Sequence, residues 1–226
     1  SIIGAHMGPG QVLLAGSARR ELTDAGGTNY FNALLAIDSA GTVVATYDKA
    51  HLVPFGEYLP APEAFRALGI ASLTARIGGA FTPGPGLRTI RLPGVPAFGA
   101  LICYEALFPA DVVAPGDRPR WLVNLTDDSW FGTQTGPHQH LVAARFRAIE
   151  EGLPVVRAAT TGISAVIDAR GGLVASTRLQ TAAAIDIELP AAYPPTLFAR
   201  IGHTGFFVMI ALAFAGGWVQ RRRRAT

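Results

Sequence analysis

Cysteine is almost missing from this chain: the 226 residues contain one, Cys103. A single thiol excludes an internal disulfide and a cysteine-rich metal site. Charge is sparse as well, because 15% of the residues are charged while half are hydrophobic. Four of the 19 basic residues stand together at Arg221 to Arg224, near the C-terminus. The rest of the chain has 15 basic and 16 acidic residues. Its net charge is therefore near zero, and we expect no nucleic-acid partner.

The sequence also lacks the motifs of several common catalytic and binding sites. There is no G-x-S-x-G nucleophile elbow and no phosphate-binding Walker loop. One H-x-H pair, His138 and His140, stands on the opening turn of a predicted helix, where positions two apart do not share a face. No carboxylate or cysteine stands beside the pair at ligand spacing. We therefore expect neither a metal nor a cofactor.

Short apolar or β-branched runs alternate with helical segments along the body. They predict strands at residues 12–15, 33–37, 42–46, 87–92, 98–102, 121–125, 155–159, 163–167 and 183–187. Turn residues at 39–41 and 168–172 predict two hairpins. One helix is expected from Pro137 to just before Gly152, and a weaker one over 63–68. Hairpins mixed with helices favour a layered α+β domain over a doubly wound parallel sheet.

The C-terminal stretch has the composition of a membrane helix. Residues 201–220 carry no formal charge if His203 is neutral, and they would extend about 30 Å as a helix. Trp218 stands near the far end of this stretch and the arginine cluster follows it, as at a membrane interface. We expect a catalytic domain at 1–190, a linker at 191–200, a transmembrane helix at 201–220 and a cytoplasmic basic tail at 221–226. The body would then be periplasmic in a bacterium. A buried C-terminal helix is the alternative, and the missing polar stripe argues against it.

Cys103 closes the apolar run 98–102, where polar residues begin. A free cysteine is often a buried space-filler, and position alone leaves that reading open. In an oxidising compartment, however, a lone cysteine is more easily explained as a working thiol. Strand ends of this kind hold reactive side chains on a rigid sheet.

Lys49 and Glu57 flank a loop rich in proline and glycine. Each would ordinarily be a surface charge, but Glu57 stands eight residues after Lys49 and could turn back to fix its ammonium. A lysine brought to Cys103 by the fold would favour the thiolate and then face the oxyanion of an acyl-transfer intermediate.

Three ordered blocks carry a family resemblance. Residues 47–57, 101–105 and 124–132 resemble the nitrilase (carbon–nitrogen hydrolase) superfamily. More narrowly, residues 51–60, 136–140 and 144–150 resemble the apolipoprotein N-acyltransferase family. The resemblance covers nearly the whole chain. It implies an α-β-β-α sandwich and, in the narrower family, a C-terminal transmembrane helix.

The resemblance also implies catalytic roles. Cys103 would be the nucleophile, Lys49 the cation that supports the tetrahedral oxyanion, and Glu57 the glutamate that holds the lysine. Glu105 matches a further glutamate important in the acyltransferases. The base glutamate of the family lies upstream of the strand matched by residues 12–15, and none of the first eleven residues is acidic. Glu21 follows that strand and does not match. The chain is therefore expected to be a C-terminal fragment without the base.

Substrate contacts follow from the same resemblance. The N–H of Tyr104 is a candidate oxyanion donor, and Trp130 and Phe131 match a loop that lines the lipid entrance. The implied partners are a phospholipid acyl donor, a diacylglyceryl apolipoprotein acceptor and the bacterial inner membrane.

Acyl transfer through a thioester on Cys103 is the expected activity. A membrane-tethered amidase, with water as the acceptor, is the alternative enzyme, and an inactive membrane-anchored binding module is the alternative outside enzymes. The apolar C-terminal stretch and residues 54–58 favour the acyltransferase, and the joint presence of Lys49, Glu57 and Cys103 argues against the inactive module.

Overall fold

Two β-sheets form the body of the protein. The computed structural model describes residues 4–24, 26–67 and 81–224. The first sheet is an antiparallel meander of β1 (Val12–Leu22), β2 (Thr28–Asp38) and β3 (Val43–Asp48). The turn at 39–41 joins β2 to β3 as predicted, and Gly41 adopts a φ of 78° there. Its lack of a Cβ makes that left-handed conformation accessible.

The second sheet has six strands in the order β4-β5-β6-β7-β8-β9. They are β4 (Thr89–Leu92), β5 (Val95–Ile102), β6 (Trp121–Asp127), β7 (Val155–Thr160), β8 (Ala165–Ile167) and β9 (Leu173–Ser176). Strands β5, β6 and β7 run parallel, and the outer pairs are antiparallel. The central strands are mostly apolar because both faces of the sheet are covered, and Asn124 of β6 and Arg157 of β7 are buried polar exceptions. The sheet places the C-terminal ends of β5 and β6 side by side.

One predicted strand is absent from the structure, and one strand of the structure was not predicted. Residues 183–187 form no strand, although their apolar run resembles one. Residues 173–176 do form an edge strand, β9, which completes the hairpin predicted at 168–172. Both segments are largely exposed, so hydrophobicity does not separate an edge strand from an extended loop, and pairing with a neighbour decides.

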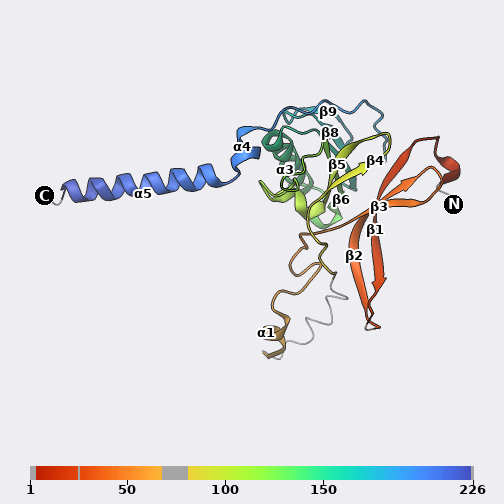
Figure 1. Ribbon diagram of the computed structural model, residues 1–226, viewed down its shortest axis with the longest axis horizontal. Coiled ribbons are helices and arrows are strands. Elements are labelled where there is room, and N and C mark those ends of the chain that lie inside the picture. Colours follow the sequence, from red (N-terminus) through yellow and green to blue (C-terminus); the bar gives the residue numbers. More distant parts are fainter. Residues whose placement is uncertain (1–3, 25, 68–80, 225–226) are drawn as a thin grey trace.

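The sheets pack face to face, and a helix covers the outer face of the larger one (Figure 1). Leu34 and Tyr47 of the first sheet meet Phe98, Ile102 and Val123 of the second. On the other side α3 (Thr135–Glu151) buries one face against the sheet. It ends at Gly152, whose φ is 65°, as the sequence predicts. The α+β sandwich is therefore confirmed in its two sheets and this helix layer.

Short helices connect these elements. Single 3₁₀ turns occur at η1 (Gly4–His6), η2 (Cys103–Leu107) and η3 (Asp128–Phe131). The expected helix at 63–68 corresponds to α1 (Pro62–Ala67), and Leu68 lies outside the described residues. In the expected linker at 191–200, α4 (Leu197–Ile201) begins after Thr196, whose hydroxyl accepts from the N–H of Ala199.

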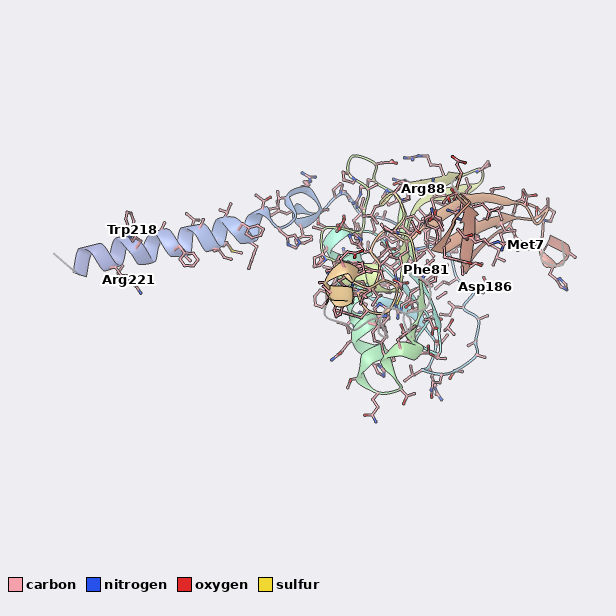
Figure 2. All side chains as sticks on the ribbon, turned by 90° about the horizontal axis from the view of Figure 1, so that it is seen from below. Met7, Phe81, Arg88, Asp186, Trp218 and Arg221 are labelled. Atoms are coloured by element: carbon pink, nitrogen blue, oxygen red, sulfur yellow. The ribbon has the colours of Figure 1, made fainter. Side chains whose placement is uncertain are left out.

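The chain ends in α5 (Thr204–Arg224), which extends away from the body as a single rod (Figure 1). Trp218 and Arg221 stand near its far end, remote from both sheets (Figure 2). Among the residues that the structure describes, no helix is long and apolar enough to cross a membrane. The transmembrane helix predicted at 201–220 is therefore not confirmed, and neither is the topology inferred from it. The continuously apolar part of α5 covers only residues 206–215, and the helix includes polar residues at both ends.

Candidate active site

Cys103 stands where β5 ends and η2 begins. Its φ is 48°, a left-handed conformation that a residue with a Cβ rarely adopts. Such a backbone costs on the order of 1–3 kcal/mol and persists only where neighbouring contacts enforce it. The side chain is half-buried and the thiol is free. The strand end thus presents the sulfur from a fixed, strained turn.

Lys49 and Glu57 form an ion pair within the loop that follows β3. The distance from Lys49 Nζ to Glu57 Oε2 is 2.7 Å, and the lysine side chain is 1% exposed. Glu57 Oε2 also accepts from the N–H of Val53, and its Oε1 accepts from the side-chain amide of Asn32 at 2.8 Å. Glu57 therefore does turn back on Lys49, and the ammonium has a single defined place.

Glu105 lies inside the protein rather than in the site. It is fully buried, and its Oε1 accepts from the Tyr47 hydroxyl and from the N–H groups of Ala50 and His51. Its Oε2 accepts from the N–H of Ile102 at 2.7 Å. Burial raises the pKa of Glu105, while the four donors oppose that shift. The carboxylate joins the loop of Lys49 to the turn of Cys103, which is a positioning contact.

One cavity of about 910 Å³ brings the predicted residues together. Cys103, Lys49 and Glu57 line it, and so do the three predicted substrate contacts, Tyr104, Trp130 and Phe131. The remaining wall is mainly apolar, with Leu14, Val53, Phe81, Ile102, Leu107 and Leu125 among its members. Trp130 is 76% exposed. A thiol and a lysine ammonium on one apolar cavity suit attack on a carbonyl carbon with charge stabilisation of the oxyanion.

Asn32 and Asp127 are polar residues of the cavity that were not predicted from the sequence. Asn32, on β2, holds Glu57, and Asp127 stands at the end of β6. The available signal was that Asn32 lies on β2 directly before the apolar run 33–37, where a polar side chain needs a partner. Asp127 lies within the block 124–132, in which only Trp130 and Phe131 are predicted to contact substrate.

The H-x-H pair occupies two different environments. His138 is exposed, whereas His140 is 3% exposed and hydrogen-bonded to Asp128. Over residues 4–24, 26–67 and 81–224, no group of three or more histidine, cysteine or acidic side chains is placed to hold a metal ion.

The family model for carbon–nitrogen hydrolases matches residues 9–194 of this chain. This chain belongs to the carbon–nitrogen hydrolase family. The match extends from just before β1 to just before α4, so it contains both sheets and every residue of the cavity.

Curated relatives of this carbon–nitrogen hydrolase carry a narrower name. The chain is 50% identical over 206 residues to the apolipoprotein N-acyltransferase of Bradyrhizobium diazoefficiens, which covers 90% of this chain and 38% of that protein. It is 45% identical over 205 residues to the apolipoprotein N-acyltransferase of Rhodopseudomonas palustris, with the same coverage. The resemblance to this narrower family is thereby confirmed. The chain spans less than half the length of these relatives.

Solved structures support the carbon–nitrogen hydrolase fold. A mutant amidase from Nesterenkonia sp. AN1, solved with the acetamide moiety of fluoroacetamide added covalently at its active-site cysteine, matches with a TM-score of 0.53. The identity is 20%, and the match covers 76% of this chain and 58% of the amidase. A carbon–nitrogen hydrolase from Helicobacter pylori G27 matches with a TM-score of 0.50 at 19% identity, over 73% of this chain and 57% of that one. These likenesses concern the fold.

Proposed function

We propose that the protein is an N-acyltransferase that moves an acyl chain from a phospholipid, through a thioester on Cys103, to the N-terminal diacylglyceryl-cysteine of apolipoproteins. One observation carries the proposal: a single apolar cavity holds the thiol of Cys103 and the Lys49–Glu57 ion pair. The names of the relatives supply the substrate class.

Transfer takes place in two halves. In the first, the sulfur of Cys103 bonds to the ester carbonyl carbon, and the ammonium of Lys49 faces the oxyanion that forms. The bond from that carbon to the ester oxygen then breaks, and the lysophospholipid leaves with a proton. In the second half the α-amine of the acceptor attacks the thioester, the carbon–sulfur bond breaks, and an amide and the free thiol result.

A general base has to take the thiol proton and later the amine proton. Glu57 is engaged by Lys49, Val53 and Asn32, and Glu105 is engaged by four donors outside the cavity. We therefore keep the base as the glutamate that the family resemblance places before the strand matched by β1.

The apolar wall suits a lipid donor. Trp130 and Phe131, on η3, expose large rings at the cavity, and Leu107 and Tyr104 extend the same surface from η2. Burial of an acyl chain against such side chains is favourable by about 0.8 kcal/mol for each CH₂ group. Lipid substrates imply work at the bacterial inner membrane. The exposed apolar side chains of α5, such as Phe206, Phe207 and Phe214, are consistent with contact to lipid.

The test is acyl-enzyme formation by the full-length protein. Incubated with a phospholipid labelled in its acyl chain, the wild type should acquire a label that hydroxylamine removes. Cys103→Ala should acquire none, and Cys103→Ser should be nearly as defective, because a serine hydroxyl stays protonated at neutral pH. Addition of a diacylglyceryl peptide should then move the label from the wild type to the peptide amine.

Two results would contradict the proposal. Equal labelling of the wild type and Cys103→Ala would exclude Cys103 as the nucleophile. Release of the label as free fatty acid, with none on the peptide, would make the protein a hydrolase that uses water as its acceptor.

A further inference from the structure

A buried polar cluster is hydrogen-bonded to the backbone of Cys103. It consists of Asp128 on η3, His140 on α3 and Arg157 on β7. The three side chains are at most 4% exposed, and none of them lines the cavity. Buried charged groups of this kind are retained only with compensating partners. The hydrogen-bond partners of these three side chains include the backbone of Cys103, the proposed nucleophile.

His140 connects the cluster to Cys103. Its Nδ1 lies 2.8 Å from Asp128 Oδ1, and its Nε2 lies 3.1 Å from the backbone carbonyl oxygen of Cys103. Arg157 holds the other carboxylate oxygen, with Nη2 at 2.6 Å from Asp128 Oδ2. The guanidinium is anchored in turn, because its Nη1 donates to Asn124 Oδ1.

The protons of His140 follow from its neighbours. A carbonyl oxygen only accepts hydrogen bonds, so Nε2 has to carry a proton in order to bind Cys103. Burial by itself raises the pKa of Asp128, but the hydrogen bond with His140 and the charge of Arg157 outweigh burial and leave that pKa below its usual value. Asp128 is therefore an acceptor, and it orients the ring through Nδ1 at 2.8 Å. Arg157 Nη2 carries two protons, so it can serve both Asp128 Oδ2 and, at 3.3 Å, Nδ1 of His140.

The backbone of Cys103 needs such a contact. With a φ of 48°, the residue is held in a conformation that a free chain would leave. Glu105 fixes the preceding residue by accepting from the N–H of Ile102. His140 fixes the peptide that follows, at the carbonyl of Cys103. The nucleophile is thus held on both sides of its Cα, by two buried side chains from different parts of the fold.

We propose that His140, oriented by Asp128 and Arg157, is a positioning residue that holds the carbonyl of Cys103 and so sets the direction of its thiol. This role deepens the proposed function, on which its kinetic consequence rests. His140 does not line the cavity. Its ring contacts Phe131 of the cavity wall, with the ring centroids 5.0 Å apart, as well as the carbonyl of Cys103, and we expect its effect on the chemical step to act through Cys103.

Replacement of His140 in the full-length protein tests this role. His140→Leu removes the donor to the carbonyl, whereas His140→Gln keeps an N–H at about the place of Nε2. We expect thioester formation by His140→Leu to be about 100-fold slower, the loss typical of a misplaced reacting group, with KM for the phospholipid within about threefold of wild type. His140→Gln should recover at least about tenfold of that loss. His138→Leu, on the exposed face of the same helix, is the matched control and should behave as wild type.

Alkylation of the thiol separates this inference from the function itself. Iodoacetamide needs no acyl substrate, so the order of alkylation rates should again be wild type, His140→Gln, His140→Leu. A wild type without transfer activity that keeps this order would overturn the function but not the positioning role. Equal alkylation and equal kcat in His140→Leu and wild type would overturn the positioning role, as would equal defects in the leucine and glutamine variants.

The wild type supplies a test that does not depend on how the variants fold. In ¹⁵N-histidine-labelled protein, with His140→Gln for assignment, Nε2 of His140 should carry a proton. An Nε2 without a proton would overturn the inference, because it could not bind the carbonyl of Cys103.

Discussion

Single side chains of the candidate site differ sharply in how they are held. Lys49 is buried and has one carboxylate partner, whereas Trp130 is largely exposed at the same cavity. A lysine ammonium is a compact point charge, and an arginine guanidinium is a planar fork that needs more room and more acceptors. The pocket around Lys49 offers one carboxylate oxygen that Val53 already shares.

Lys49→Arg should therefore fail although it keeps the charge. The guanidinium would displace Glu57 and misplace the cation relative to the oxyanion, and we expect thioester formation to fall by about 10²- to 10³-fold, the loss typical when one oxyanion donor is removed. Single-turnover acylation with labelled phospholipid measures this. Arg20→Lys, an exposed exchange of the same two residue types, is the control and should change nothing. A near-normal rate for Lys49→Arg would make Lys49 dispensable for the chemistry.

The sequence could predict Cys103, Lys49 and Glu57 as a group because each stands within a local block whose spacing and flanks are readable. It could not predict what Glu105 does. A carboxylate two residues from the cysteine suggested chemistry, and only the folded chain brings Tyr47, Ala50 and His51 to it. Long-range hydrogen bonds of this kind leave no periodic pattern in the sequence.

At the scale of elements, the loop that follows β3 is held by residues 81–84, which belong to no strand. Phe81 N–H donates to the carbonyl of Glu57, and Gly84 N–H donates to the carbonyl of Lys49 at 2.8 Å. Phe81, labelled on the body in Figure 2, also lines the cavity. A Cβ on Gly84 would lie 2.1 Å from the carbonyl oxygen of Asp48, which no real structure tolerates.

Gly84→Ala should consequently loosen the site from outside the catalytic residues. The added methyl group has to push residues 81–84 away from β3, which we expect to cost at least about 2 kcal/mol of unfolding free energy and to slow acylation. Thermal unfolding together with the acylation rate measures both effects. Gly8→Ala, where the new Cβ would meet only the Gln11 side chain at 3.5 Å, is the matched control. Equal melting temperatures for the two variants would show that residues 81–84 accommodate the added methyl group without loss of stability.

The same scale explains the strand predictions. Central strands such as β6 are apolar because both of their faces are covered, so their sequence identifies them. The edge strand β9 and the extended residues 183–187 are both exposed, and no local pattern separates them. The sequence does not predict the direction of the strands either. β5, β6 and β7 run parallel, and this arrangement is set by how the strands pair in the folded sheet.

At the scale of the whole molecule, the protein consists of a packed sandwich and a rod, α5, that extends away from it (Figure 1). The exposed large side chains of α5 include Phe206, Phe207, Met209, Leu212 and Phe214. A group of large exposed apolar side chains on one helix is typical of an interaction site. We expect its partner to be the lipid in which the proposed donor resides.

Removal of residues 204–226 from the full-length protein should weaken its hold on membranes while leaving the sandwich intact. Flotation of the protein with phospholipid vesicles, compared before and after the deletion, measures the contribution of α5. A milder variant, Phe206→Ser combined with Phe207→Ser, should show a part of the same effect. Unchanged flotation in both variants would mean that α5 serves another partner. Unfolding temperatures of the two proteins check that the body is unaffected, since α5 contributes nothing to either core cluster.

The burial of Lys49 has one more consequence, because it is the only lysine among the 226 residues. An endoprotease specific for lysine has a single bond to cut in this stretch, between Lys49 and Ala50, and that bond lies inside the site. Cleavage there requires the loop to leave Glu57 and Glu105, so its rate follows the open fraction of the site rather than global unfolding. The rate of cleavage after Lys49 therefore reports how often the active site opens, and any ligand that fills the cavity should lower that rate.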